Sequence, residues 1–364
     1  MSRNDMKVQK ILFVAPEMRA RGTNEYIVHL AKELRRRGVD VTVFCGPGPM
    51  LKVLGENDIP LHTFDRLGEQ RLSGKERERF KMALEEFEPQ LIHAQTAKVA
   101  RMVISVTEDV PVPLLLTLHA VPSKARILRS IVRSTAGIVA TSQYLREELV
   151  NECGVEKSSI HVIPNGIDMD GLAHEEVRPI FQNGIPVIGC VGPVEKARGY
   201  ELFVKAAAKI VRDGQNWQFV VGGEGEELPR LRKMSTELGL DDSLTFVGNF
   251  SSYAEILDAL DIVVQSAQVQ VSGFSILDAM GRGRPVVAFN TGTACELIDS
   301  GSTGVIVPMD DINRLSEAIV NLAGNPDEAR RMGEAARREV AETFNIRKVT
   351  SDMLALYSEL IPGK

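Results

Sequence analysis

The chain has 364 residues, a formal net charge of −6, 44% hydrophobic residues and 5% aromatic residues. This composition is typical of a globular protein of about two domains, and it excludes disordered, collagen-like and coiled-coil classes. The acidic balance and the few aromatic side chains also argue against a nucleic-acid partner, because proteins that read nucleic acids combine basic surfaces with stacking aromatics.

The beginning of the chain and its cysteines favour a cytoplasmic protein. Residues 1–10 are polar and charged, without an apolar stretch before a small-residue cleavage site, so no secretory signal is expected. No apolar run reaches the length of about 18 residues that a membrane span needs. The cysteines form no CxxC pair, and we expect them to be reduced thiols. They are Cys45, Cys153, Cys190 and Cys295.

Short apolar runs alternate with amphipathic helical patterns in the first half of the chain. Residues 10–15 are predicted to form a buried strand that ends at Pro16, and a turn through Gly22 leads to apolar residues at helical spacing up to Leu34. Gly38 is typical of a helix C-terminus. Further buried strands are predicted at 39–44, 91–93, 114–118 and 137–140. Continuous apolar strands separated by helices predict a parallel sheet that is covered on both faces.

The same pattern restarts near residue 185. A strand is predicted at 185–191 and a helix at about 200–213. More strands are predicted at 218–221, 244–247, 262–264, 285–289 and 305–307. Both halves carry Ala-Arg-Gly in the turn after their first strand, so they look like two copies of one doubly wound α/β unit. Such a unit binds ligands at the carboxyl ends of its strands.

The expected domain boundary lies at the Pro-Asn-Gly string of residues 164–166, because such residues punctuate regular structure. This gives an N-terminal domain over 1–168 and a C-terminal domain over 169–345. A last helix in 346–364 could pack back on the N-terminal domain or dock on the other one.

Three strings resemble those of a known family. They are Ile163 to Asp168 (Ile-Pro-Asn-Gly-Ile-Asp), Ser266 to Ala288 (ending in Gly-Arg-Pro-Val-Val-Ala) and Gly301 to Pro308. In this order and spacing they resemble the retaining, nucleotide-sugar-dependent glycosyltransferases of the GT4, or group 1, family. The resemblance covers nearly the whole chain and implies the GT-B fold, in which two Rossmann-like, doubly wound parallel-sheet domains face each other across a cleft. It also implies a nucleotide-sugar donor on the second domain, an acceptor on the first, and no metal ion or other cofactor.

The diphosphate of the donor is expected at one strand-to-helix turn of the second domain. The turn residues are Gly273, Phe274 and Ser275. Leaving phosphates are stabilised by backbone N–H groups and helix N-termini, although the same residues also suit an ordinary helix start. The family has two glutamates eight positions apart here, on the donor sugar and on the ribose, and Gln270 and Asp278 occupy their positions. Asp278 keeps an acceptor for ribose hydroxyls, whereas Gln270 keeps hydrogen bonding to the sugar without the negative charge.

The resemblance also assigns cations and backbone to the nucleotide. The family's Arg and Lys on the diphosphate correspond to Pro193 and Arg198. Arg198 can bind phosphate bidentately and Lys196 could supply the missing charge, the alternative being that both belong to a solvated loop. Gly248 belongs to the stretch whose backbone is expected to face the nucleobase.

In the first domain, Gly22 matches the family's glycine-rich turn, where the backbone approaches the donor phosphates. His119 directly follows a predicted strand and matches the family histidine that faces the donor sugar. With Gln270 it is predicted to surround the transferred sugar. His93 matches the first member of a family His-x-His pair, whose second position is Gln95 here, and we expect His93 to be structural.

A basic amphipathic stretch follows His119. Arg126, Arg129 and Arg133 recur at helical spacing after Lys124, with apolar residues between them. Such a stretch could touch an anionic membrane or a lipid-linked acceptor, and the alternative is a solvated helix face. The expected partners are therefore a nucleotide-sugar donor and a saccharide or lipid-linked acceptor, and the expected location is the cytoplasm or the inner face of the membrane.

These features predict a retaining, metal-independent glycosyltransferase that uses a UDP- or GDP-sugar to make a glycan, a glycolipid or a small glycoside. The alternative is a nucleotide-sugar-binding or scaffold protein with impaired catalysis, because Gln270 and Pro193 depart from the family pattern. A GT-B epimerase or phosphorylase is a third option. No dinucleotide, P-loop or metal-ligand motif supports an oxidoreductase.

Overall fold

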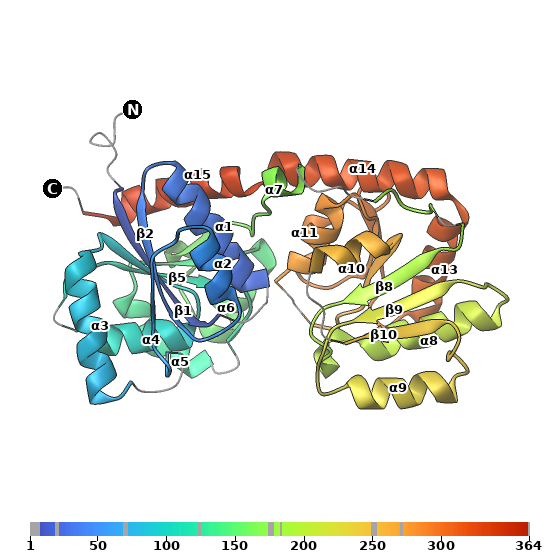
Figure 1. The fold of residues 1–364 in the computed structure, drawn as a ribbon, viewed down its shortest axis with the longest axis horizontal. Helices are drawn as coiled ribbons and strands as arrows, with labels where there is room; N and C mark the ends of the chain where they lie inside the picture. The colour runs from blue at the N-terminus through green and yellow to red at the C-terminus, as the bar shows by residue number, and fades with distance from the viewer. Residues whose placement is uncertain are drawn as a thin grey trace. The chain divides into compact units, whose positions relative to one another are not determined.

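The computed structural model divides into two compact units, which are described separately (Figure 1). Unit 1 comprises Met1–Gly166 and Ile346–Lys364, and unit 2 comprises Ile167–Asn345. The structure describes residues 8–18, 22–67, 72–108, 110–122, 125–173, 178–182, 184–248, 253–269 and 272–362. The first boundary falls after Gly166, within the Pro-Asn-Gly-Ile-Asp string.

Unit 1 is built on a seven-stranded parallel sheet of order β3-β2-β1-β4-β5-β6-β7. Its strands are β1 (Lys10–Glu17), β2 (Asp40–Gly46), β3 (Leu61–Thr63), β4 (Leu91–Ala94), β5 (Leu114–Leu118), β6 (Gly137–Ala140) and β7 (Ile160–Val162). Its helices are α1 (Gly22–Arg36), α2 (Met50–Glu56), α3 (Gly74–Phe87), α4 (Ala97–Val106), α5 (Ala125–Ile131), α6 (Gln143–Cys153) and α15 (Ile346–Leu360), with short 3-10 turns η1 (Val132–Ser134) and η2 (Lys157–Ser159). The strand order reverses between β1 and β4, as in a doubly wound fold.

Unit 2 is built on a six-stranded parallel sheet of order β10-β9-β8-β11-β12-β13. Its strands are β8 (Val187–Val191), β9 (Gln218–Gly222), β10 (Leu244–Val247), β11 (Ile262–Gln265), β12 (Val286–Phe289) and β13 (Gly304–Val307). Its helices are α7 (Met169–Ala173), α8 (Tyr200–Arg212), α9 (Leu228–Glu237), α10 (Tyr253–Ala259), α11 (Phe274–Gly281), α12 (Ala294–Leu297), α13 (Ile312–Gly324) and α14 (Pro326–Thr343), with a 3-10 turn η3 (Lys196–Arg198). The order reverses between β8 and β11. The sequence predicts two doubly wound, Rossmann-like sheets, and both are confirmed.

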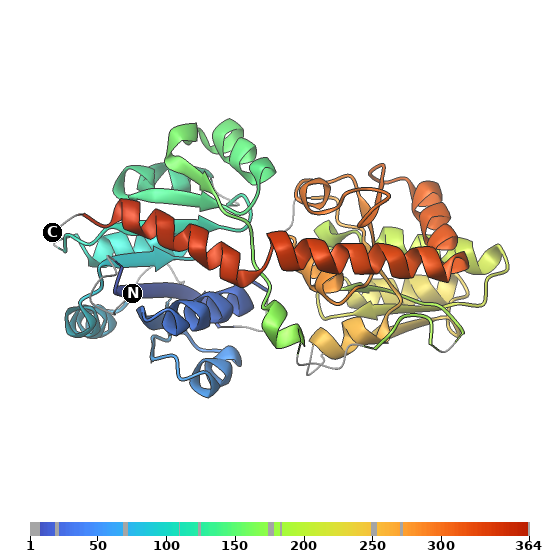
Figure 2. The same cartoon turned by 90° about the horizontal axis from the view of Figure 1, so that it is seen from above.

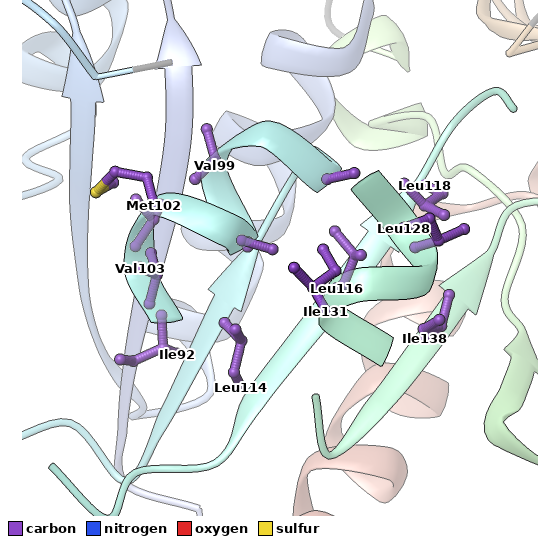
Figure 3. Packing of buried hydrophobic residues seen from close by; sticks show 14 of the residues in the cluster. Ile92, Val99, Met102, Val103, Leu114, Leu116, Leu118, Leu128, Ile131 and Ile138 are labelled. Carbon is purple, nitrogen blue, oxygen red and sulfur yellow. The ribbon is translucent and has the colours of Figure 1, made fainter. Parts of the chain in front are cut away.

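The core of unit 1 forms where helices cover one face of its sheet (Figure 3). Strands β4, β5 and β6 contribute Ile92, Leu114, Leu116 and Ile138, while α4 and α5 contribute Val99, Met102, Val103, Leu128 and Ile131. Each side chain of this kind stabilises the fold by roughly 1.5–3 kcal/mol when it is fully buried. The strands are continuous apolar runs in the sequence because helices bury their side chains.

The structure corrects the predicted end of the first strand. β1 does not stop at Pro16 but continues to Glu17, which pairs with Gly46 of β2. The register shifts between Val14 and Glu17. Proline has no backbone N–H to give to the ladder, so the pairing is interrupted at Pro16 and resumes one residue later.

Helix α15 belongs to unit 1 and lies beside α1 (Figure 2). Val349 and Met353 are buried on its inner face. Arg37, just after α1, donates hydrogen bonds to the Ser351 hydroxyl (2.8 Å) and to the Arg347 carbonyl (2.6 Å). The helix thus contributes to the N-terminal core although it ends the chain. Among the residues that the structure describes, no helix combines the length and apolar character needed to cross a membrane.

Candidate functional site

The candidate donor site lies in unit 2, where the strand order reverses between β8 and β11. In open α/β sheets ligands bind outside the carboxyl ends of the strands at such a reversal. The turn after β8 carries Lys196 and Arg198 in η3, and the turn after β11 leads to Gly273 at the start of α11. Residues from two turns that are far apart in the sequence therefore converge on one edge of the sheet.

The two turns touch through their backbones. Gly199 has φ +66°, and a Cβ there would lie 1.8 Å from the carbonyl oxygen of Ser266. The Ser266 hydroxyl donates to the Arg198 carbonyl (3.3 Å), and the Gln268 backbone N–H donates to the Ala197 carbonyl (3.2 Å). Only glycine permits both this close approach and this left-handed conformation. Gly199 thus allows the cationic η3 turn to pack against the end of β11.

Helix α11 begins in the second of these turns. Gly273 precedes it with φ +77°, and a Cβ there would lie 2.6 Å from Leu297 Cδ1. Gln265, at the end of β11, donates from Nε2 to the Ser275 hydroxyl (2.7 Å). Phe274 is buried, and Asp278 follows one turn later, half-buried. The positive end of the helix dipole therefore lies at the strand-order reversal, where an anion would be favoured.

Neither cation of the η3 turn forms an ion pair with a carboxylate of the described residues. Arg198 is half-buried. Burial raises the pKa of the nearby Tyr200 phenol well above its usual value, and the charge of Arg198 acts in the opposite direction there and at the Cys190 thiol. Burial outweighs this effect and raises the pKa of Cys190 to about 11. A guanidinium that pairs with no carboxylate of the described residues is suited to binding phosphate.

Lys196 is exposed and lines a small pocket of about 140 Å³ at the start of α8. The pocket also carries Arg230 and three carboxylates. The carboxylates are Glu195, Glu201 and Glu227. Glu201 and Glu227 both accept hydrogen bonds from Arg230 (2.6 and 2.8 Å). The acidic lining disfavours a diphosphate inside this pocket, so Arg198 and the start of α11 form the better anion site.

Gly248 and Gln270 are also predicted to face the donor, and the structure describes only the first of them. Gly248 directly follows β10, and a Cβ built there would meet no atom within 4 Å. The space beside its Cα is therefore open, although the residue is half-buried. Gln270 lies outside the described residues, as do Arg21 and Lys124.

Unit 1 gathers buried polar side chains at the carboxyl ends of β4, β5 and β7. His119 follows β5, Gln95 follows β4 and Asn165 follows β7, and each is less than a tenth exposed. His119 Nδ1 lies 3.0 Å from Asn165 Oδ1, and its Nε2 lies 3.5 Å from Gln95 Oε1. The ring of Tyr26, from α1, meets the imidazole edge-on at 5.5 Å. Gly22 begins α1, close to the end of β1 in the sequence.

Burial makes His119 a neutral side chain at physiological pH. Desolvation lowers its pKa to about 4, although the hydrogen bond with Asn165 acts in the opposite direction. His119 is therefore suited to hydrogen bonding with a neutral group rather than to forming an ion pair. Sequence reasoning does not assign Asn165 and Tyr26 to the site. Asn165 lies within the Pro-Asn-Gly string, which is the signal that the sequence offers.

His93 is buried deeper and has structural partners. Its Nδ1 lies 2.7 Å from the Tyr357 hydroxyl of α15, and its Nε2 lies 2.6 Å from the Thr117 hydroxyl of β5. Burial, followed by repulsion from His119, lowers its pKa to about 3. His93 therefore links β4 and β5 to the last helix.

Arg129, from the basic stretch on α5, also forms hydrogen bonds within unit 1. Its guanidinium donates to the carbonyls of Cys153 (2.9 Å) and Glu152 (3.1 Å), which lie at the end of α6. A cation at this position satisfies carbonyls that have no partner within the helix. The stretch is thus not a purely solvated face.

The Gly-Arg-Pro string of unit 2 also has a structural explanation. Arg284 is 1% exposed and donates to the carbonyls of Leu257 (3.2 Å) and Asp258 (3.1 Å), while Arg282 donates to the Asp258 carboxylate (2.7 Å). These bonds tie the end of α11 to the end of α10. The string therefore supports the helix that begins at the donor site.

Family models match both units of the chain. Residues 175–339 match the model of "Glycosyl transferases group 1", and residues 20–170 match that of "Glycosyltransferase Family 4". Among solved structures, that of HepE from Anabaena in complex with UDP and glucose has a TM-score of 0.82 at 21% identity, covering 96% of this chain and 100% of the other. At this identity the likeness shows the fold alone, and it is the GT-B fold expected from the sequence.

Two curated relatives show the same kinship in sequence. Alpha-D-kanosaminyltransferase of Streptomyces kanamyceticus is 26% identical over 242 residues, which are 64% of this chain and 62% of the relative. A GDP-mannose-dependent alpha-(1-6)-phosphatidylinositol monomannoside mannosyltransferase of Mycobacterium tuberculosis is 28% identical over 235 residues, 60% of each chain. The matched region thus spans about three-fifths of these relatives. With models of the family matching both of its units, the chain belongs to the group 1, or family 4, glycosyltransferases.

Proposed function

We propose that the protein transfers a sugar, with retention of configuration and without a metal ion, from a UDP- or GDP-sugar to a saccharide or lipid-linked acceptor. One edge of unit 2 carries this proposal. Arg198 there has no carboxylate partner among the described residues, and its turn packs against the end of β11, the strand that leads to α11. A guanidinium and a helix N-terminus together suit a diphosphate.

In the proposed reaction the diphosphate leaves from the anomeric carbon while the acceptor oxygen bonds to that carbon on the same face. The proton of the acceptor hydroxyl passes to the departing phosphate oxygen. Arg198 and the start of α11 stabilise the charge that develops on the diphosphate. Asp278 accepts hydrogen bonds from ribose hydroxyls, and the Gly248 backbone faces the base. No covalent nucleophile is required.

His119 has the complementary part in this proposal. It is neutral because burial lowers its pKa to about 4, and it lies at the carboxyl edge of the unit 1 sheet. A neutral imidazole can hydrogen-bond a sugar hydroxyl without adding a positive charge near an oxocarbenium-like centre. Gln270 occupies the sequence position at which the family has an acid on the donor sugar.

The relatives support a nucleotide-sugar donor without choosing the base. HepE was crystallised with UDP and glucose, and the mycobacterial relative is named as GDP-mannose-dependent. The latter name also refers to a phosphatidylinositol mannoside. For this chain we therefore keep both bases, and both a saccharide and a lipid-linked acceptor.

The direct test is transfer from radiolabelled UDP- and GDP-sugars, with and without EDTA, to a panel of saccharides and lipid-linked saccharides. We expect labelled product, or slow release of labelled sugar to water, from a donor of one base, and no loss of rate in EDTA. If the purified chain neither turns over nor binds any member of the panel, the proposal is wrong.

A second candidate function is a nucleotide-sugar-binding protein without turnover, and the departures at Gln270 and Pro193 favour it. The variant Gln270→Glu separates the two. It should change the turnover rate of an enzyme, because a carboxylate near the anomeric centre acts on the transition state. In a binding protein it should change only the affinity for the nucleotide sugar.

A further inference from the structure

The turn that follows β11 is held on two sides. On one side the Gln268 backbone N–H donates to the Ala197 carbonyl of the η3 turn (3.2 Å), and the Ser266 hydroxyl donates to the Arg198 carbonyl (3.3 Å). On the other side the Gln268 side chain donates from Nε2 to Asp310 Oδ1 (2.7 Å). Gln268 therefore connects the η3 turn to the loop that follows β13.

The bond to Asp310 reaches across a neighbouring strand. β12 lies between β11 and β13 in the sheet, and Gln268 and Asp310 each come three residues after the end of one of the outer strands. Strands that are separated by one other strand lie about 10 Å apart, so only side chains can make this connection. The hydrogen bond thus links three strand-to-helix turns at the carboxyl edge of the sheet, where ligands of doubly wound sheets bind.

Asp310 is an unexpected residue at its position. Its φ is +62°, in the left-handed region that glycine adopts without strain. Its side chain is exposed, and no cation of the described residues pairs with its carboxylate. A negative charge is also unfavourable at an edge that is proposed to bind a diphosphate. Glycine would suit the loop better on both counts, so the bond to Gln268 is what the aspartate adds.

We propose that Asp310 is a positioning residue for the donor site. Its carboxylate holds Gln268, and through Gln268 it keeps the turn after β11 against the η3 turn, so that the Arg198 guanidinium stays where it binds the diphosphate. Asp310 itself touches neither the donor nor a reacting atom. The effect on donor binding rests on the proposed function, whereas the connection between the three turns does not.

Unit 1 contains a matched control for Asp310. Asp58, shortly after α2, is also exposed and also has a left-handed backbone, with φ +53°. Its side chain has no hydrogen-bond partner among the residues that the structure describes. Replacing either aspartate by glycine relieves the same backbone conformation, but only Asp310→Gly removes a connection between turns. A difference between the two variants therefore reports on the hydrogen bond rather than on the backbone.

The first measurement is calorimetric titration of the full-length protein with UDP and GDP, together with thermal unfolding. We expect Asp310→Gly and Gln268→Met to bind the preferred nucleotide about three- to tenfold more weakly than the wild type, as the loss of one hydrogen bond requires. Asp58→Gly should keep the wild-type affinity. Both glycine variants should unfold within about 2 °C of the wild type, because relief of strain offsets the greater freedom of the unfolded chain.

Exchanging the donor and the acceptor of the bond is a sharper test. Gln268→Glu places two carboxylates next to each other and should weaken nucleotide binding at least as much as Gln268→Met. When Gln268→Glu is combined with Asp310→Asn, the asparagine amide can donate to the new carboxylate, and asparagine tolerates the left-handed backbone. This double variant has the same net charge as the wild type, and we expect it to recover most of the wild-type affinity.

Amide hydrogen exchange followed by NMR tests the connection without a ligand. We expect the Gln268 backbone N–H, which is bonded to Ala197, to exchange faster in Asp310→Gly than in the wild type. In Asp58→Gly and in the double variant it should exchange at the wild-type rate.

Equal exchange of this N–H in Asp310→Gly and Asp58→Gly would overturn the proposal, and so would equal nucleotide affinity in these two variants. Failure of the double variant to bind better than Gln268→Glu alone would also contradict it. If the wild type binds no nucleotide, the proposed function and the effect on binding fail together, while the exchange rates still decide whether Asp310 holds the turn.

Discussion

At the scale of single residues, unit 2 contains a buried arginine whose guanidinium forms hydrogen bonds within the fold. Arg284 is 1% exposed and donates hydrogen bonds to the carbonyls of Leu257, Asp258 and Arg178, and its guanidinium lies 3.5 Å from the Asp258 carboxylate. We expect Arg284→Ala to lower the free energy of unfolding by about 3–5 kcal/mol, because it removes several buried hydrogen bonds and one of the two cations beside the partly buried Asp258 carboxylate. Arg314→Ala, which removes an exposed arginine paired with Glu317, should cost less than about 1 kcal/mol.

Urea denaturation of both variants checks this prediction. Equal midpoints for the two arginine variants would show that the contacts of Arg284 do not stabilise unit 2 more than a surface ion pair does.

The buried histidines make the stability of the protein depend on pH. Burial lowers the pKa of His93 from 6.5 to about 3 and that of His119 to about 4. Between these values and pH 6.5 the unfolded chain binds protons that the folded chain does not, so stability is highest above pH 6.5 and is lost as the pH falls. Each histidine should contribute a slope of about 1.4 kcal/mol per pH unit in that range.

Denaturation curves at pH 7 and pH 5 measure this slope. We expect a clear loss of stability at pH 5 in the wild type and a smaller loss in His93→Gln. The same loss in both proteins would mean that His93 does not titrate as its burial requires.

At the scale of elements, the η3 turn depends on Gly199. A Cβ at this position would lie 1.8 Å from the Ser266 carbonyl oxygen, so Gly199→Ala must push the turn away from β11. Gly214 has a similar left-handed backbone, with φ +95°, but a Cβ there would meet no atom within 4 Å. We expect Gly214→Ala to cost roughly 1 kcal/mol of strain and to leave nucleotide affinity unchanged.

Gly199→Ala should destabilise the protein more strongly and should also weaken nucleotide binding, because Arg198 moves with the turn. Thermal unfolding and calorimetric titration with UDP and GDP separate the two effects. Equal behaviour of the two alanine variants would contradict the close contact between the η3 turn and β11.

The last helix is a second element whose role can be measured. Met353 is fully buried on α15, whereas Asp352 beside it is exposed. We expect Met353→Ala to lower the free energy of unfolding by about 2–5 kcal/mol and Asp352→Ala to change it by less than about 0.5 kcal/mol. Chemical denaturation distinguishes them, and a cost for Met353→Ala as small as that for Asp352→Ala would show that α15 is not part of the unit 1 core.

At the scale of the whole molecule, the alternation of apolar runs and helical patterns is enough to predict two doubly wound sheets. It is not enough to find β3 and β7, because strands of three residues carry too few side chains to show a pattern. The strand-to-helix turns with Arg198 and Gly273 can be located, since such turns follow strand ends. The contact of Gly199 with Ser266 cannot be predicted from the sequence. Neither can the contact of His119 with Asn165, which lies 46 residues later, because both contacts depend on how distant segments pack.

We propose that the reversal between β8 and β11 binds the diphosphate of a nucleotide sugar through Arg198. Calorimetric titration of the wild type, Arg198→Ala and the control Arg314→Ala with UDP, GDP and their sugars tests it most directly. We expect one base to bind the wild type and the control equally, and Arg198→Ala to bind it about ten- to a hundredfold more weakly, as the loss of a charged hydrogen bond of about 1.5–3 kcal/mol requires. Affinity unchanged in Arg198→Ala, or no binding of either nucleotide to the wild type, would contradict the account.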